Sequence, residues 1–209
     1  MNTNKNSYII LYSTVMVVIV AFLLAFIYQT LKPMQDVNVA LDKKKQILAS
    51  LNIRDVSDSE AEAKYQEVVK AENTVGEGLT LYQCEVDGNK KVVVPVRGMG
   101  LWGPIWGYVA LDDDKTTIFG AYFNHESETA GLGAEIKDSR AWQDQFRGKK
   151  VYSVDGKVVI AVKKKSDVKN PESECDAVTG ATLTSDGVSL MLHDCMSRYQ
   201  KAIQSVTKK

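Results

Sequence analysis

The stretch Leu79-Thr-Leu-Tyr-Gln-Cys-Glu-Val86, Asp87-Gly-Asn-Lys90, Lys91-Val-Val-Val-Pro-Val96 decides the fold. Two runs rich in β-branched and aromatic residues flank a turn composition, which is typical of a β-hairpin. Further strand-like runs occupy 105–111, 116–123 and 157–163, and 112–115 reads as a second tight turn. The sequence therefore predicts consecutive antiparallel strands after residue 79.

Helical spacing surrounds these strands. Residues 58–70 open with cap-forming and acidic side chains and predict a surface helix, and 139–146 predicts a shorter one. From Ser185 onward a single apolar stripe predicts a carboxyl-terminal helix, with its methionines in the core and His193 off the stripe; the stripe comprises Val188, Met191, Leu192, Cys195, Met196, Tyr199 and Ile203. Together these patterns predict an α+β domain.

The amino-terminal part is a membrane anchor by composition. Residues 8–31 carry no charge, and 24 helical residues span about 36 Å, enough to cross a bilayer. A cleaved signal peptide is the alternative, but the run is long for one and Phe26-Ile-Tyr-Gln29 is a bulky cleavage site. We expect a tail at 1–7, a transmembrane helix at 8–31, a helical stem at 32–72 that resumes after Pro33, and a domain at 73–209.

Charge and cysteine content restrict the function. The chain has 26 Lys plus Arg and 26 Asp plus Glu, which argues against nucleic-acid binding. The lysines after the span, at positions 32 and 43–45, outnumber the single Lys5 before it and favour a cytoplasmic domain. Cys84, Cys175 and Cys195 have no C-x-x-C spacing, which argues against zinc and leaves a disulfide and free thiols equally open.

Two segments are unusual for a purely structural domain. Residues 97–107 place four glycines and the tryptophans Trp102 and Trp106 in a short connection, which suits either a flat aromatic ligand or a turn with both rings in the core. Residues 125–133 contain His-Glu, but Thr129 replaces the second histidine of a metalloprotease helix, so that motif fails. This second loop can bind a heterocycle or be a solvated turn.

A third segment, Asp176-Ala-Val-Thr-Gly-Ala-Thr-Leu-Thr-Ser-Asp-Gly187, precedes the last helix. Small and hydroxyl residues at a helix amino terminus form an anion site, because free N–H groups and the helix dipole converge there. Phosphate is the natural ligand, although the segment lacks the lysine of a Walker loop. The alternative is an ordinary helix cap by Thr184 or Ser185.

Residues 176–182 resemble the flavinylation motif of the FMN-binding domain family, which implies that Thr182 is esterified to the phosphate of FMN. Residues 100–112 and 128–133 resemble segments of the C-subunit family of sodium-translocating NADH:quinone reductases, with Ala130 where that family has proline. The resemblance implies that this chain has no catalytic residue and no metal ligand. It also implies further contacts to FMN, from Asp176, Thr179, Gly180, Ala181, Leu101, Trp102, Glu128, Thr129, Leu132 and Gly133.

The same resemblance implies a function. The chain would relay electrons in a complex that oxidises NADH, reduces ubiquinone or a related quinone and exports Na⁺, together with the other subunits and a flavin transferase that uses FAD. It would cross the bacterial inner membrane once, with its domain on the periplasmic side, against the lysine count. The alternatives are the flavin subunit of the Rnf ferredoxin:NAD oxidoreductase, which Leu101-Trp102 disfavours, and a cofactor-free anchored binding or assembly module.

Overall fold

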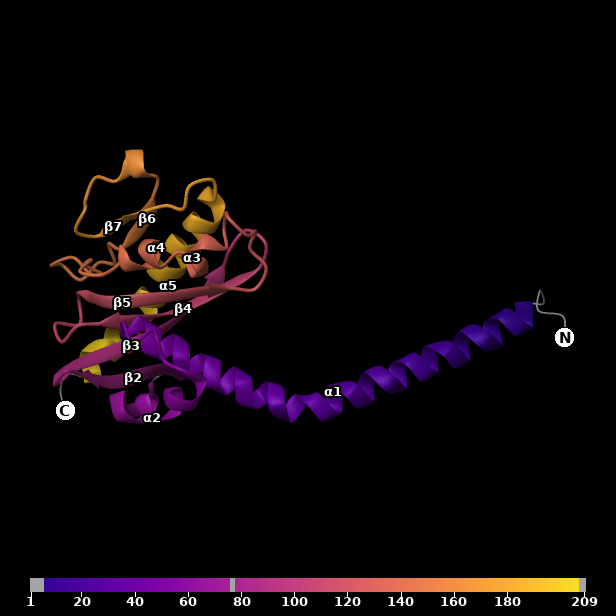
Figure 1. Ribbon diagram of the computed structural model, residues 1–209. Coiled ribbons are helices and arrows are strands. Elements are labelled where there is room, and N and C mark those ends of the chain that lie inside the picture. The colour runs from indigo at the N-terminus through magenta and orange to yellow at the C-terminus, as the bar shows by residue number, and fades with distance from the viewer. Residues whose placement is uncertain (1–5, 76–77, 207–209) are drawn as a thin grey trace. The chain divides into compact units, whose positions relative to one another are not determined.

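The computed structural model describes residues 6–75 and 78–206, and its centre is one antiparallel sheet (Figure 1). The sheet has the order β1-β2-β3-β4-β5, so consecutive strands are neighbours. Its strands are β1 (Val69–Val75), β2 (Leu79–Val86), β3 (Asn89–Met99), β4 (Pro104–Leu111) and β5 (Ile118–His125). The expected α+β class and the antiparallel strands are confirmed.

The hairpin that decides the fold forms as expected, with a tighter turn. Val86 pairs with Asn89, so the loop consists of Asp87 and Gly88 alone. Both have positive φ, 50° and 75°. That is the geometry of a two-residue turn whose twist matches the strands, and glycine adopts it without strain. Asn89 and Lys90 therefore belong to β3 and not to the turn.

Both faces of the sheet are buried. On β3, Val92 and Val94 join one apolar cluster and Val93 joins the other, because successive side chains point to opposite faces. The first face is covered by α3 (Glu135–Asp138), α4 (Arg140–Asp144) and α5 (Thr182–Val206), the second by α2 (Asp58–Val68) and the end of α1 (Figure 1). The expected stripe of α5 is buried in the first cluster, while His193 is exposed.

Helix α1 (Asn6–Ser50) continues through Pro33, whereas the sequence suggested a new start there. Proline removes one backbone donor, and the helix tolerates this loss at an exposed position. From Ile9 to Leu31 the large apolar side chains are exposed, as suits contact with lipid. By length and composition α1 is a helix that can cross a membrane once.

The compact unit of the domain begins at Lys43, inside the expected stem 32–72. Ile47, Leu48 and Leu51 are buried in the second apolar cluster, so the last turns of α1 are core. Val69–Val75, expected at the end of the stem, forms the edge strand β1 by pairing with β2. The sheet thus starts four residues before the expected boundary at 73, because pairing overrides the weak strand propensity of this segment.

The remaining elements differ in detail. The expected strand 157–163 is reduced to β6 (Ala161–Lys163), which pairs in parallel with β7 (Glu174–Asp176), and the run 116–123 becomes β5. A short 3₁₀ turn, η2 (Lys165–Asp167), lies between β6 and β7. All three cysteines are buried free thiols, and burial raises the pKa of Cys84 and of Cys175 to about 12. The open choice is thereby resolved in favour of thiols in this structure.

Candidate functional site

The three unusual segments of the sequence meet at the Glu128 side chain, which is 7% exposed. Its Oε1 accepts a hydrogen bond from Trp102 N at 2.8 Å, and its Oε2 accepts one from Thr184 Oγ1 at 2.6 Å. Ser127 Oγ adds a bond to Trp102 O at 3.1 Å. A single carboxylate therefore joins the β3–β4 connection, the loop after β5 and the first turn of α5.

Two glycines enclose this carboxylate. A Cβ at Gly100 would overlap Glu128 Oε1, and one at Gly133 would overlap Oε2 and approach Thr184 Oγ1 at 2.6 Å. The glycines of the two loops thus permit close approach of backbone to a side chain of the protein itself. Gly133, a candidate FMN contact, is buried against this carboxylate.

The first turn of α5 distinguishes its hydroxyls. The helix begins at Thr182, three residues earlier than the stripe predicted, so Thr184 and Ser185 lie inside it. Both are buried: Thr184 donates to Glu128, and Ser185 Oγ accepts from Val178 N at 3.0 Å. The interpretation of either as an ordinary amino-terminal cap is therefore wrong. Thr182 is half-buried and lines a cavity of about 550 Å³.

Apolar side chains are exposed on the loops around this turn. Leu101 is 48% exposed, Trp102 67%, Leu132 43% and Leu183 61%. Leu132 lies against Gly180, whose φ of 77° favours glycine and where a Cβ would stand 2.9 Å from Leu132 Cδ2. The loop after β5 thus contacts the segment that leads into α5.

The two tryptophans have separate environments. Trp102 is exposed, so the interpretation that places its ring in the core is wrong. Trp106 is half-buried on β4 and donates from Nε1 to Gln46 Oε1 at 3.0 Å, toward the end of α1. Only Trp102 is linked to Glu128.

The other candidate residues occupy the rim or the backbone of the site. Thr179 and Gly180 are exposed, Ala181 is buried and Asp176 is half-buried, with its carbonyl accepting from Trp142 Nε1 at 2.8 Å. Thr129 is exposed, and its carbonyl accepts from Leu132 N and Ala134 N. These two bonds close the loop that contains Ala130.

Sequence reasoning missed the basic side of the Thr182 cavity, which Lys163, Lys164 and Lys169 line together with Asp167 and Asp186. Glu174 organises this loop: its Oε2 accepts from Asn170 N and Lys169 N, and its Oε1 from Lys163 Nζ at 2.6 Å. The bond from Asn170, then those from Lys163 and Lys169, lower the pKa of Glu174 to about 2. The lysine run was visible in the sequence, but its proximity to Thr182 was not.

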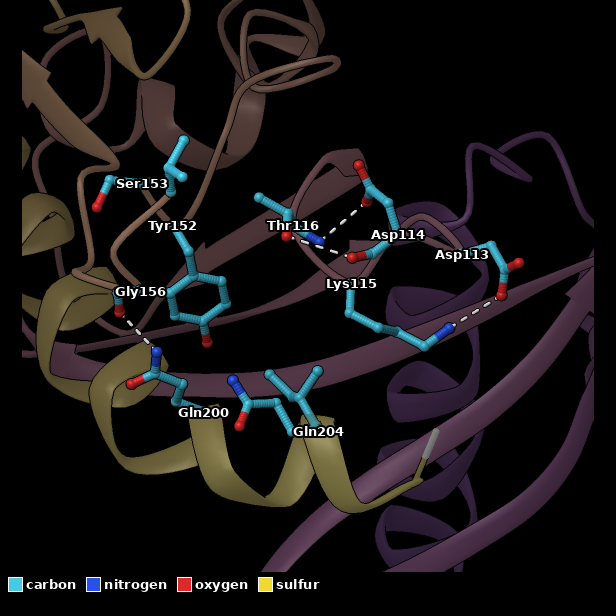
Figure 2. Close-up of a pocket in the computed structure, with 11 residues that line it drawn as sticks. Asp113, Asp114, Lys115, Thr116, Tyr152, Ser153, Gly156, Gln200 and Gln204 are labelled. Carbon is cyan, nitrogen blue, oxygen red and sulfur yellow. Dashed lines mark hydrogen bonds and ion pairs between the residues drawn. The ribbon is translucent and has the colours of Figure 1, made fainter. Parts of the chain in front are cut away.

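A slightly larger cavity, about 570 Å³, lies at the far end of α5 (Figure 2). Gln200 is 18 residues after Thr182, about 27 Å along the helix. Polar groups here bond to one another: Lys115 pairs with Asp113, Thr116 N donates to Asp114, and Gln200 donates to Gly156 O. Within residues 6–75 and 78–206 no group of acidic, histidine or cysteine side chains could hold a metal ion.

Comparisons with known proteins agree with this geometry. Residues 100–197, which include the second and third segments and most of the first, match the family model of the FMN-binding domain. The C subunit of the Na⁺-translocating NADH-quinone reductase of Vibrio alginolyticus is 39% identical over 102 residues, 49% of this chain and 40% of that protein. The corresponding protein of Pasteurella multocida is 36% identical over 135 residues, 65% and 47% of the two chains. The aligned region thus spans less than half of either relative.

Solved structures extend the comparison to most of the chain. The C subunit of this reductase from Parabacteroides distasonis is 37% identical with a TM-score of 0.76, covering 83% of this chain and 96% of that one. NqrC of Shewanella oneidensis, at 21% identity and a TM-score of 0.66 over 79% and 98% of the two chains, shows the same fold. By sequence and by structure, this chain belongs to the NqrC family, the C subunits of Na⁺-translocating NADH-quinone reductases, and contains the FMN-binding domain of that family.

Proposed function

We propose that this protein carries FMN covalently on Thr182 Oγ, through a phosphoester, and relays electrons with it inside a Na⁺-translocating NADH-quinone reductase. The observation that carries the proposal is the state of the hydroxyls in the first turn of α5. Thr184 and Ser185 are buried and bonded inside the protein, whereas Thr182 lines an open cavity. Of these three, Thr182 is the one that a transferase can reach.

The surroundings of Thr182 fit the two chemical halves of FMN. On the phosphate side, the first N–H groups of a helix have no partner within it, and Lys164 and Lys169 line the same cavity. On the other side, the exposed Leu101, Trp102 and Leu132 offer apolar and aromatic surface to a flat ring. Attachment through the phosphate leaves the ring free to lie on these side chains.

The attachment step balances with FAD as the donor and a separate transferase as the catalyst. Thr182 Oγ forms a bond to the phosphorus next to riboflavin, and the bond from that phosphorus to the bridging oxygen breaks, releasing AMP. The hydroxyl proton leaves to a base of the transferase. FMN, once bound, supplies the redox chemistry, while the chain provides orientation and electrostatics.

The same family membership supports the remaining assignments. We propose residues 8–31 as a single span of the bacterial inner membrane, the domain on the periplasmic side, and the other subunits of the reductase as partners. NADH oxidation, quinone reduction and Na⁺ transport belong in this proposal to the assembled complex. Between Tyr8 and Leu31 the helix offers no ionisable carboxylate or ammonium group for ion conduction, as suits an electron relay.

Peptide mapping tests the proposal. The full chain is produced with a flavin transferase of this system, and its intact mass and tryptic peptides are measured. We expect the mass of one esterified FMN on the peptide that contains Thr182. An unmodified chain, or FMN mapped to Thr179 or Thr184, would contradict the assignment.

A further inference from the structure

Glu128, which sequence reasoning placed among the direct cofactor contacts, has a different role in this structure. We infer that it is a positioning residue, which fixes the Trp102 loop against the first turn of α5 and does not itself bind the flavin. The inference rests on the proposed attachment at Thr182. In this role Glu128 holds the Trp102 loop, which would face the flavin ring, at a fixed position relative to Thr182, which would carry the phosphate.

The carboxylate is already engaged by the protein. Each oxygen accepts one hydrogen bond, from Trp102 N and from Thr184 Oγ1, and the residue is 7% exposed. Because buried carboxylates need such donors, the side chain has one stable orientation, turned inward. Gly100 and Gly133 enclose both oxygens so closely that a Cβ at either position would overlap them.

The positions of two functional side chains follow from this bond pair. The Trp102 ring is 67% exposed, so packing does not fix it, and its location depends on a backbone held by Glu128 and Ser127. Thr184 is two residues after Thr182 on a helix, so its bond fixes the turn that presents the attachment hydroxyl. Glu128 therefore sets the separation between aromatic surface and attachment point.

Two substitutions at Glu128 distinguish the effect of its two hydrogen bonds from the effect of removing its side chain. In Glu128→Gln the amide oxygen can accept from Trp102 N and the amide N–H can donate to Thr184 Oγ, so both links persist. In Glu128→Ala both links are lost. Glu126→Ala, an exposed carboxylate in the same loop, is the matched control.

The experiment uses the full chain produced with the transferase. We measure flavin circular dichroism in the visible range, quenching of flavin fluorescence by iodide, and hydrogen exchange of the Trp102 amide. In Glu128→Ala we expect FMN to remain on Thr182, the visible circular dichroism to change, iodide quenching to rise at least about twofold, and the Trp102 amide to exchange at least about tenfold faster. Glu128→Gln and Glu126→Ala should stay within about threefold of wild type in exchange.

A Glu128→Ala protein with wild-type flavin spectrum and a protected Trp102 amide would overturn the inference. If that variant does not fold, Thr184→Val removes one link with little change in volume, and Thr74→Val, at an exposed threonine on β1 outside the site, is its control. Thr184→Val should change the flavin spectrum and Thr74→Val should not; equal spectra would overturn the inference. Absence of FMN from the wild-type chain contradicts the proposed function instead, and the Trp102 amide measured on flavin-free protein still tests Glu128.

Discussion

Thr182 and Thr184 stand two residues apart in the first turn of α5 and face opposite environments: Thr184 is 1% exposed and donates to Glu128, whereas Thr182 is half-buried beside the open cavity. On a helix two residues are separated by about 200°, so one side chain faces the core when the other faces outward. Of these two hydroxyls, the register of the helix leaves only that of Thr182 beside the cavity, as the proposed attachment requires.

Thr182→Ala should abolish covalent FMN and leave the domain folded, with a loss of stability of at most about 1 kcal/mol. Thr184→Ala should retain covalent FMN, but it leaves Glu128 without one donor and should lower the free energy of unfolding by about 1 to 3 kcal/mol. In-gel flavin fluorescence and urea denaturation of both variants check this. A Thr182→Ala protein that keeps covalent flavin would show that the attachment residue is another one.

The substitution Gly187→Ala tests how closely α5 packs against the end of β3. Alanine is favoured over glycine inside a helix by about 1 kcal/mol. A Cβ at Gly187, however, would overlap the Met99 carbonyl oxygen, which is a backbone atom and cannot move away as a flexible side chain can. Such overpacking typically costs about 1 to 3 kcal/mol, so we expect Gly187→Ala to lower the urea midpoint. Ser197→Ala, exposed on the same helix, should raise it slightly; a rise in both would contradict the close approach.

Much of the fold could be predicted from local pattern. The hairpin around Asp87 and Gly88 and the apolar stripe of α5 depend on short-range chemistry, namely turn composition and periodicity. Strand β1 could not be predicted, because its sequence has few strand-forming residues and its pairing with β2 decides the structure. The continuation of α1 through Pro33 was missed for a similar reason: its carboxyl-terminal turns are stabilised by the core.

For the candidate site, the sequence identified the segments but not their connections. The attachment turn and the two glycine-rich loops were visible as motifs, and Trp102 was a candidate. That Glu128 reaches Thr184, 56 residues away, follows only from the three-dimensional fold. From the sequence, the glycines of the two loops suited the approach of a ligand. In the structure, Gly100 and Gly133 instead make room for the carboxylate of Glu128.

The loop that carries Lys164 and Lys169 should loosen in acid. The folded pKa of Glu174, about 2, lies below its ordinary value of 4.5, so its contribution to stability is complete above pH 4.5 and is lost as the pH falls toward 2. We expect the Lys169 and Asn170 amides, both bonded to Glu174, to lose exchange protection over this range, after correction for intrinsic rates. Glu174→Gln should remove this pH dependence, and its persistence in that variant would assign it to another group.

The two tryptophans of residues 97–107 should respond differently to substitution. Trp102→Ala should leave stability unchanged within about 0.5 kcal/mol, because the ring is 67% exposed, and should leave FMN attached with an altered spectrum. Trp106→Ala removes a half-buried ring and its bond to Gln46, so it should destabilise the domain by about 1 to 3 kcal/mol with little spectral change. Denaturation and visible spectra separate the two; an unchanged spectrum in Trp102→Ala would remove that residue from the ring site.

The domain should lie outside the cytoplasm, although the lysines after the span favour the opposite orientation. In the folded domain Lys43 pairs with Glu72, Lys44 with Glu62 and Lys45 with Asp58, so the triplet has a structural use. These ion pairs give the three lysines a role in the folded domain on either side of the membrane. Protease added to right-side-out spheroplasts should digest the domain, and digestion only in inverted vesicles would place it in the cytoplasm. If the domain lies outside the cytoplasm against the charge of these lysines, a chain with Lys43, Lys44 and Lys45 replaced by Gln should keep the same protease pattern.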